Sequence, residues 1–219
     1  MIKLWHTLRD GDPYGGARNS NKIVIALDEI GEKCDLQAVR RMEDVRPQDA
    51  PYRKLNPNGV VPTIEEDGLV LWESGAILRY LADTRPGKGL LPQDAKARAS
   101  ADQWLTWEGA TLAPALINLF MLMMAEQPDE QAMAGASAVY MGGLGILDQQ
   151  LAGRDYVAGD FSAADIALGS LVPISFNVGL DLSGNGNIIA WLNRLRARPA
   201  FSGNEMFTAD CEAGAAQLG

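Results

Sequence analysis

The chain has 219 residues, of which 47% are hydrophobic and 21% are charged, and its formal net charge is −9. A chain of this length and composition can bury one large hydrophobic core or two small ones, so we do not expect extensive disorder. The negative net charge repels phosphate backbones, so we expect no nucleic acid among the partners. A small neutral or zwitterionic ligand fits this charge better.

The sequence predicts a cytoplasmic protein without a membrane span. The longest apolar stretch, residues 116–125, contains Asn118 and is shorter than the ~20 residues needed to cross a bilayer. Residues 1–6 alternate like a strand and lack the layout of a signal peptide. Cys34 and Cys211 are far apart in the sequence and form no Cys-x-x-Cys motif, so we expect neither a disulfide framework nor a metal site.

The first eighty residues show an alternation of strand and helix patterns. Residues 2–6 and 34–39 alternate like strands, and the apolar residues of 20–30 have helical spacing, which predicts a crossover helix between two parallel strands. Residues 60–72 contain a strand, an Asp-Gly turn and a second strand, which is typical of a hairpin. A helix is predicted for residues 74–82. This order is that of a thioredoxin-like domain.

The composition changes after this domain. Residues 83–94 are rich in proline and glycine, as interdomain linkers are. Residues 95–219 show only helical periods, with a kink expected at Pro114 and a loosely ordered tail expected after Asp210. We therefore expect an α+β protein, with a thioredoxin-like domain of order β-α-β-α-β-β-α over residues 1–82 and an all-α helical bundle over residues 95–219.

Three motifs carry a family resemblance. Asn-Pro-Asn-Gly-Val-Val-Pro-Thr at residues 56–63 and Trp-Glu-Ser-Gly-Ala-Ile at residues 72–77 together resemble the glutathione-binding core of the cytosolic glutathione transferases, of the bacterial type. Ser-Ala-Ala-Asp at residues 162–165 is similar to the N-capping box of the family's helical domain. The resemblance covers nearly the whole chain. It implies glutathione as co-substrate, a small hydrophobic electrophile as second substrate, no metal, and a two-fold homodimer.

The resemblance also implies a set of glutathione contacts. The bond between Val61 and Pro62 is expected to be cis, with the Val61 backbone turned outward to pair with an extended cysteinyl residue. Ser74, at a helix start, would hold the γ-glutamyl carboxylate, and Glu73 would pair with the ammonium group. Gln48 is assigned to the same set. The alternative is an ordinary hairpin proline and an ordinary helix cap, but the order and spacing of the two motifs favour the site.

The group that would contact the glutathione sulfur is harder to assign. In many family members the first loop presents a serine or threonine hydroxyl to the sulfur, and the matching position here, counted back from Lys22, is Ala17. Either Asn19, Ser20 and the helix N-terminus stabilise the thiolate, or Tyr14, in a lengthened loop, supplies the hydroxyl. We favour the first of these alternatives, because donors at a helix N-terminus can lower a thiol pKa substantially.

These observations predict a glutathione-dependent transferase. Its thiolate would act on a small electrophile, an ether, a peroxide or a disulfide, and the sequence does not say which, because the fold alone does not fix the acceptor. The missing hydroxyl at Ala17 leaves a second hypothesis, a non-catalytic glutathione-binding or interaction protein. A mechanism through a protein thiol is disfavoured, because Cys34 follows the first helix rather than preceding it.

Overall fold

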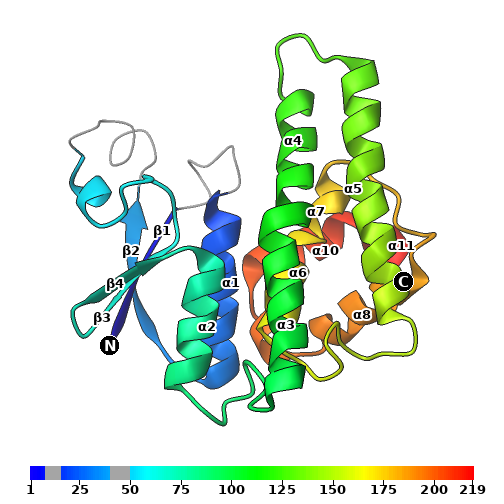
Figure 1. Cartoon of the computed structure of the whole chain (residues 1–219). Coiled ribbons are helices and arrows are strands. Elements are labelled where there is room, and N and C mark those ends of the chain that lie inside the picture. Colours follow the sequence, from blue (N-terminus) through cyan, green and yellow to red (C-terminus); the bar gives the residue numbers. More distant parts are fainter. Residues whose placement is uncertain (8–15, 40–49) are drawn as a thin grey trace. The chain divides into compact units, whose positions relative to one another are not determined.

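The computed structural model describes residues 1–7, 16–39 and 50–219, and Figure 1 shows its helices and strands. The chain divides into two compact units, Met1–Leu91 and Pro92–Gly219. The first unit contains a four-stranded mixed sheet with helices, and the second is mostly helical. The predicted α+β fold, a thioredoxin-like domain followed by an all-helical one, is confirmed.

The sheet of the first unit combines parallel and antiparallel pairs. Its strands are β1 (Ile2–Thr7), β2 (Cys34–Val39), β3 (Thr63–Glu66) and β4 (Leu69–Trp72), in the spatial order β2-β1-β3-β4. β1 and β2 are parallel, so helix α1 (Gly16–Ile30) crosses between them. β3 is antiparallel to β1 and β4. Asp67 and Gly68 join β3 to β4 with φ angles of 50° and 86°, as a type I′ hairpin turn requires, so the predicted hairpin is confirmed.

Helices α1 and α2 (Ser74–Thr84) pack together, α1 against β1 and α2 against β4 (Figure 1). Side chains of β1 alternate as the sequence predicts, with Ile2 and Leu4 buried and Lys3 exposed. The following buried side chains contribute to the core of the unit: Ile2, Leu4, Ile23, Leu27, Ile64, Ile77, Leu78 and Leu81. The apolar faces predicted for the two helices therefore form this core.

Helix α1 begins earlier than the sequence predicts. It starts at Gly16 rather than near Ser20, and Gly31 follows its end with a φ angle of 72°, as expected for a C-terminal glycine. The glycines that precede Ala17 favour a loop, but alanine and arginine are strong helix formers, and Ala17 and Arg18 belong to the helix. Residues expected in the first loop are thus part of α1.

Between β2 and β3 the sequence predicts a further helix. Residues 40–49, in the part of the chain where this helix is expected, lie outside the described residues. The described remainder forms a single 3-10 turn, η3 (Pro51–Lys54). Tyr52 in this turn is buried and packs with Val39 and Val61.

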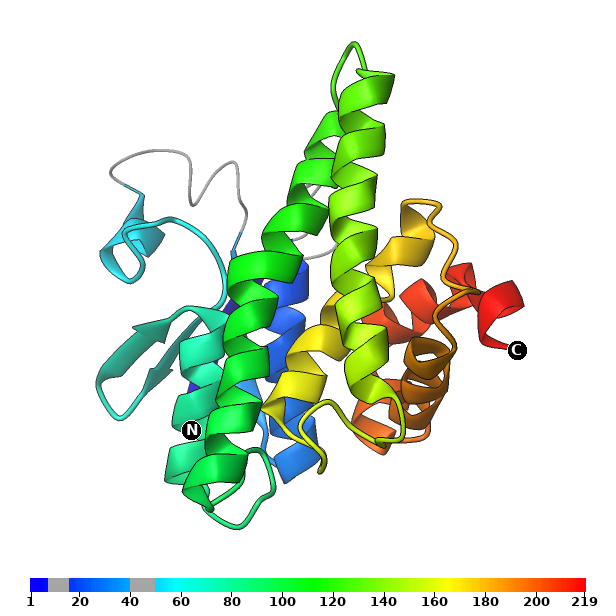
Figure 2. The same ribbon diagram turned by 45° about the vertical axis from the view of Figure 1, so that its right-hand side comes forward.

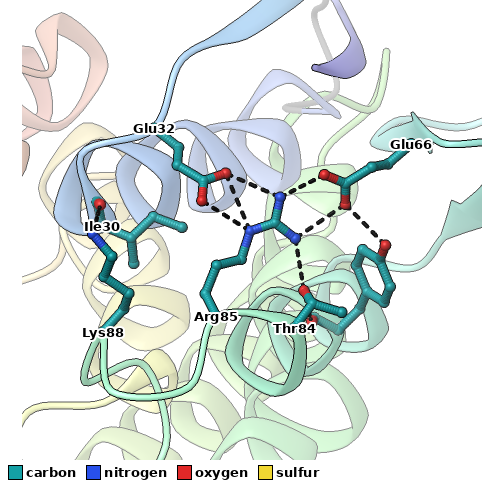
Figure 3. A network of polar contacts seen from close by, with 7 residues as sticks. Ile30, Glu32, Glu66, Thr84, Arg85 and Lys88 are labelled. Carbon is teal, nitrogen blue, oxygen red and sulfur yellow. Dashed lines mark hydrogen bonds and ion pairs between the residues drawn. The ribbon is translucent and has the colours of Figure 1, made fainter.

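Arg85 connects three elements of the first unit (Figure 3). Its guanidinium donates hydrogen bonds to both carboxylate oxygens of Glu32, which follows α1, and to the carboxylate of Glu66 at the end of β3. Glu66 also accepts a hydrogen bond from the hydroxyl of Tyr80 in α2 at 2.8 Å. The hydrogen bonds from Arg85 lower the pKa of Glu66. Because β3 runs from Thr63 to Glu66, this network lies at the end of the sheet opposite to Thr63.

Helices make up most of the second unit. They are α3 (Ala95–Trp107), η4 (Glu108–Leu112), α4 (Ala113–Met123), α5 (Glu130–Leu151), α6 (Ala163–Leu171), α7 (Ile174–Asn177), α8 (Gly186–Arg196), α9 (Pro199–Ser202), α10 (Glu205–Ala213) and α11 (Ala215–Leu218). α4 and α5 lie side by side (Figure 1, Figure 2), and α6 packs against α3. A π-helical turn, η4, lies just before Pro114, the residue at which the sequence predicts a kink. Proline has no N–H and cannot continue the regular hydrogen-bond ladder.

The helical stretch Ala95–Met123 is long and apolar enough to span a membrane, with a mean hydropathy of 1.2, although core helices of soluble proteins meet the same criteria. Within the second unit it packs against α5 and α6. Trp104, Leu112, Leu116 and Leu119 of this stretch are buried there. These contacts are those of a helix within a bundle.

The predicted capping box at the start of α6 is confirmed. The Ser162 hydroxyl accepts a hydrogen bond from the N–H of Ala164, and the Asp165 carboxylate accepts from the N–H of Ser162 at 3.0 Å. Asp165 also accepts from the N–H of Val157 at 2.9 Å and from the indole N–H of Trp191 at 3.0 Å. Burial raises the pKa of Asp165 to about 6, and these donors oppose the rise. The box therefore ties α6 to α8 and to the loop before it.

The expectation of a loosely ordered tail is wrong. Residues after Asp210 continue α10 and form α11, and Leu218 is 4% exposed. Phe207 and Cys211 are also buried. The side-chain amide of Asn193 in α8 donates a hydrogen bond to the carbonyl of Leu218 at 2.9 Å, which fastens the tail to the bundle.

Candidate functional site

The register of the sheet brings the two predicted binding segments together. Thr63, which follows Pro62, pairs with Trp5 of β1 and with Trp72 of β4. Glu73 directly follows Trp72, so the loop before β3 and the start of α2 meet at the same end of the sheet. α1 also begins at this end, because it runs back along the sheet after β1. The described candidate residues of the first unit therefore gather at one end of its sheet.

The peptide bond between Val61 and Pro62 is cis, as predicted. Val61 as a residue is 7% exposed and belongs to a buried cluster with Val39 and Tyr52. Among the hydrogen bonds between backbone groups of the described loops and turns, none involves the N–H or the C=O of Val61. These two groups can therefore pair with the backbone of a peptide ligand.

Glu73 has an uncommon backbone conformation, with φ at 73° and ψ at 114°. A non-glycine residue in such a region costs about 1–3 kcal/mol, and residues of this kind cluster at functional sites. The side chain is exposed, and no described residue forms a hydrogen bond or an ion pair with its carboxylate. Ser74 follows as the first residue of α2, where free N–H groups and the helix dipole favour an anion. The pair can hold an ammonium and a carboxylate on one ligand.

Asn19 is fixed by a buried lysine. The ammonium of Lys22, a residue that is 2% exposed, donates a hydrogen bond to Oδ1 of Asn19 at 2.8 Å. Because an ammonium can only donate, Oδ1 must face Lys22, and the amide Nδ2 must point away from it. No described residue accepts a hydrogen bond from this Nδ2. Asn19 therefore presents two N–H donors that a ligand can use.

Ser20 is almost fully buried, at 1% exposure, and its hydroxyl has no hydrogen-bond partner among the described residues. A buried hydroxyl without a hydrogen-bond partner destabilises the fold by roughly 1–3 kcal/mol. A bound ligand that accepts a hydrogen bond from Ser20 would remove this cost. Because α1 begins at Gly16, Asn19 and Ser20 lie beyond the helix's free N–H groups. The groups that Asn19 and Ser20 can offer to a ligand are therefore their side chains.

Two predicted residues, Tyr14 and Gln48, lie outside the described residues. Three residues without a predicted role contact the predicted ones or their neighbours. Lys22 donates a hydrogen bond to Asn19, and Tyr52 and Asn56 donate to the carbonyl of Val60, the residue before Val61. The signal for Lys22 is its i+3 spacing from Asn19 on one helix face. In the described ranges, no group of three or more His, Cys, Asp or Glu side chains is placed to hold a metal ion.

Comparisons with known proteins agree on one family. The family model described as "Glutathione S-transferase, N-terminal domain" matches residues 11–83. Glutathione S-transferase GstB of Escherichia coli is 34% identical over 206 residues, which are 91% of this chain and 95% of the relative. The solved theta-class glutathione S-transferase of Xanthomonas axonopodis pv. citri, with glutathione bound, is 33% identical with a TM-score of 0.79, and 93% of this chain and 96% of that one are covered.

A second solved structure, a sphingomonad glutathione S-transferase complexed with glutathione, is 30% identical to this chain. Its TM-score is 0.78, and the likeness covers 95% of this chain and 98% of that one. These likenesses extend over both units. The chain therefore belongs to the cytosolic glutathione S-transferase superfamily and is of the bacterial type.

Proposed function

We propose that the chain is a glutathione-dependent transferase whose thioredoxin-like domain, residues 1–82, binds the tripeptide at the end of the sheet where β3 and α2 begin. Residues 83–94 then form a linker to the helical domain. The observation that supports this proposal is the pairing of Thr63 with Trp72, which brings the loop that contains Val61 and the start of α2 at Glu73 to the same end of the sheet. The names of the bound relatives support glutathione as the co-substrate.

The two ends of the tripeptide have separate partners in this proposal. The N–H and C=O of Val61, next to Pro62, pair with the cysteinyl backbone in the manner of an added strand. The γ-glutamyl carboxylate lies at the start of α2 near Ser74, and its ammonium pairs with Glu73. Gln48, which is outside the described residues, belongs to the same set by resemblance.

Asn19 is the proposed partner of the glutathione sulfur. Its Nδ2 donates to the thiolate, which stabilises the charged form and lowers the thiol pKa. The hydroxyl of Ser20, which has no hydrogen-bond partner among the described residues, is the proposed second donor. The ammonium of Lys22, behind Asn19, adds a positive charge that favours the thiolate further. The thiol proton leaves to water, and the thiolate then attacks a small hydrophobic electrophile, an ether, a peroxide or a disulfide.

Isothermal titration with glutathione tests the binding half of this proposal. We expect binding at millimolar or lower concentration, and weaker binding by a Glu73→Gln variant, which removes the charge and keeps the size of the side chain. The wild-type chain showing no heat of binding at millimolar glutathione would contradict the proposal.

The alternative hypothesis is a glutathione-binding or interaction protein without turnover. Ala17 favours it, because the hydroxyl that many family members use is missing there. A substrate panel separates the two: an aryl halide, cumene hydroperoxide, a mixed glutathione disulfide and a β-aryl ether. Glutathione-dependent turnover of any of these supports the enzyme, and binding without turnover of all four supports the alternative.

We also propose a cytoplasmic homodimer, with the thioredoxin-like domain of one subunit packed on the helical domain of the other. In the second unit, α4, the residue that follows it and α5 carry apolar side chains that are about half exposed or more: Ile117, Met121, Met124, Val139 and Ile146. Apolar surface of this kind is typical of an interaction site. Sedimentation should show twice the mass of 23.6 kDa at micromolar concentration, and only the single-chain mass would contradict a dimer.

A further inference from the structure

A closed set of hydrogen bonds lies behind the Val61 backbone. The carbonyl of Val60 accepts from the Tyr52 hydroxyl at 2.7 Å and from Nδ2 of Asn56 at 2.7 Å. The hydroxyl of Thr63 lies 2.7 Å from the Tyr52 oxygen and 3.4 Å from Nδ2 of Asn56. Tyr52, Asn56 and Thr63 are 5%, 0% and 0% exposed, so water cannot easily replace these partners.

The donors and acceptors of this set can be assigned without ambiguity. A carbonyl only accepts, so the single proton of the Tyr52 hydroxyl goes to Val60, and Thr63 must donate to the Tyr52 oxygen. Oδ1 of Asn56 accepts from the N–H of Asn58 at 3.0 Å, which leaves both amide protons of Asn56 for Val60 and Thr63. The Val60 carbonyl thus receives two donors, one for each lone pair.

The direction of the Val60 carbonyl sets the direction of the next N–H. The only cis bond in the described chain joins Val61 to Pro62, so the bond between Val60 and Val61 is trans. In a planar trans peptide the C=O and the following N–H point in opposite directions. Two donors on the Val60 carbonyl therefore turn the Val61 N–H away from the buried set. The Tyr52 ring also packs against the Val61 side chain.

We propose that Tyr52 and Asn56 are positioning residues that fix the Val61 N–H in the direction needed to bind glutathione, by holding the Val60 carbonyl from the opposite side. This inference rests on the proposed function, because it presumes that the Val61 backbone binds the tripeptide. Because these hydrogen bonds already hold the peptide unit between Val60 and Val61 in place, little conformational entropy of this unit is lost when glutathione binds.

The test is Tyr52→Phe, which keeps the ring in its cluster and removes only the hydroxyl. Isothermal titration should give a glutathione Kd that is roughly threefold to tenfold higher, the effect of one neutral hydrogen bond. Turnover at saturating glutathione should be unchanged, so the effect should appear in KM for glutathione and not in kcat.

Two matched variants separate positioning of the Val61 N–H from a general loss of stability in the first unit. Tyr80→Phe also loses a tyrosine hydroxyl of the same unit, one that donates to Glu66 at the other end of the sheet, and its glutathione Kd should equal that of the wild type. Thr63→Val removes a buried hydrogen bond of the same set but leaves both donors on Val60, so it should lower the unfolding midpoint without changing the glutathione Kd.

Three results would count against the account, and they are distinguishable. An unchanged glutathione Kd in Tyr52→Phe, with a wild type that binds, overturns the positioning role alone. A Thr63→Val variant that weakens binding as much as Tyr52→Phe also overturns it, because loosening of the core would then explain both. A wild type that does not bind glutathione overturns the proposed function, and the positioning role with it.

Discussion

The ammonium of Lys22 lies 2.8 Å from Oδ1 of Asn19, and this contact decides which face of the Asn19 amide a ligand can meet. A lysine offers only donors, so the amide cannot turn its oxygen toward the ligand without losing the bond. The contact therefore fixes the orientation of the Asn19 amide, with its N–H groups directed away from Lys22. It also holds the ammonium of the buried Lys22 next to Asn19.

Replacing Lys22 by methionine should raise the thiol pKa of bound glutathione. The variant removes the charge and releases the Asn19 amide, while the chain length of the side chain is nearly kept. We expect a rise of about one pKa unit, the usual size of a nearby charge or hydrogen bond, with little change in the glutathione Kd. Lys88→Met is the matched control, because Lys88 donates to the carbonyl of Ile30 and has no proposed contact with glutathione. An unchanged thiol pKa in Lys22→Met would contradict the role of Lys22.

Asn19→Ala should harm turnover more than binding. The amide acts on the charge at sulfur, whereas the peptide is held elsewhere, by Val61 and Glu73. Loss of one donor to a thiolate costs roughly 1.5–3 kcal/mol, so kcat should fall about tenfold to a hundredfold while the glutathione Kd changes little.

Tyr14→Phe serves as the comparison for Asn19→Ala, and it should be nearly silent in the same steady-state assay. Tyr14 lies outside the described residues, so this variant tests the alternative source of the hydroxyl. If Tyr14→Phe abolished activity and Asn19→Ala did not, the catalytic assignment would be wrong.

Glu73→Gly should stabilise the protein and weaken glutathione binding. The φ angle of 73° is unfavourable for glutamate and acceptable for glycine, so the free energy of unfolding should rise by about 1 kcal/mol despite glycine's greater freedom in the unfolded chain. Binding should weaken because the ammonium of glutathione loses its partner. Urea unfolding and isothermal titration measure the two effects. A Glu73→Gln variant, which keeps the strained backbone, should lose affinity without the gain in stability.

Arg85→Met should destabilise the first unit in a pH-dependent way. Hydrogen bonds from Arg85 lower the folded-state pKa of Glu66, so their contribution is present above the usual value of 4.5 and is lost as the pH falls through the lowered folded value. We expect a loss of roughly 1–3 kcal/mol in the free energy of unfolding near neutral pH. Wild type and variant should converge as the pH falls below that range. A difference that stays constant with pH would show that Arg85 acts through packing and not through Glu66.

The segments at the proposed site could be predicted because their chemistry is local. The cis bond before Pro62 and the hairpin turn at Asp67 follow from short motifs whose residues impose the backbone. The partners of those segments could not be predicted in the same way. Tyr52 reaches the Val60 carbonyl only because the fold buries its side chain next to Val61, and a single tyrosine in a polar segment does not predict that burial.

The start of α1 and the ordered tail were harder to predict because composition misleads there. Glycines before Ala17 suggest a loop, yet the helix begins at Gly16. Alanines and glycines after Asp210 suggest disorder, yet Phe207, Cys211 and Leu218 recur at helical spacing and are all buried. In the tail, the period of the few apolar residues was a better guide than the overall composition.

The proposed transferase activity requires that this chain hold glutathione as a thiolate at the start of α1. A pH titration of the thiolate ultraviolet absorbance, taken as the difference between protein with and without glutathione, tests it most directly. The chain's own thiols interfere little near neutral pH, because burial raises the pKa of Cys34 and raises that of Cys211 to about 11. We predict that the thiol pKa of bound glutathione is well below that of free glutathione, and that Asn19→Ala removes most of this difference. Bound glutathione that titrates like the free tripeptide would contradict the claim.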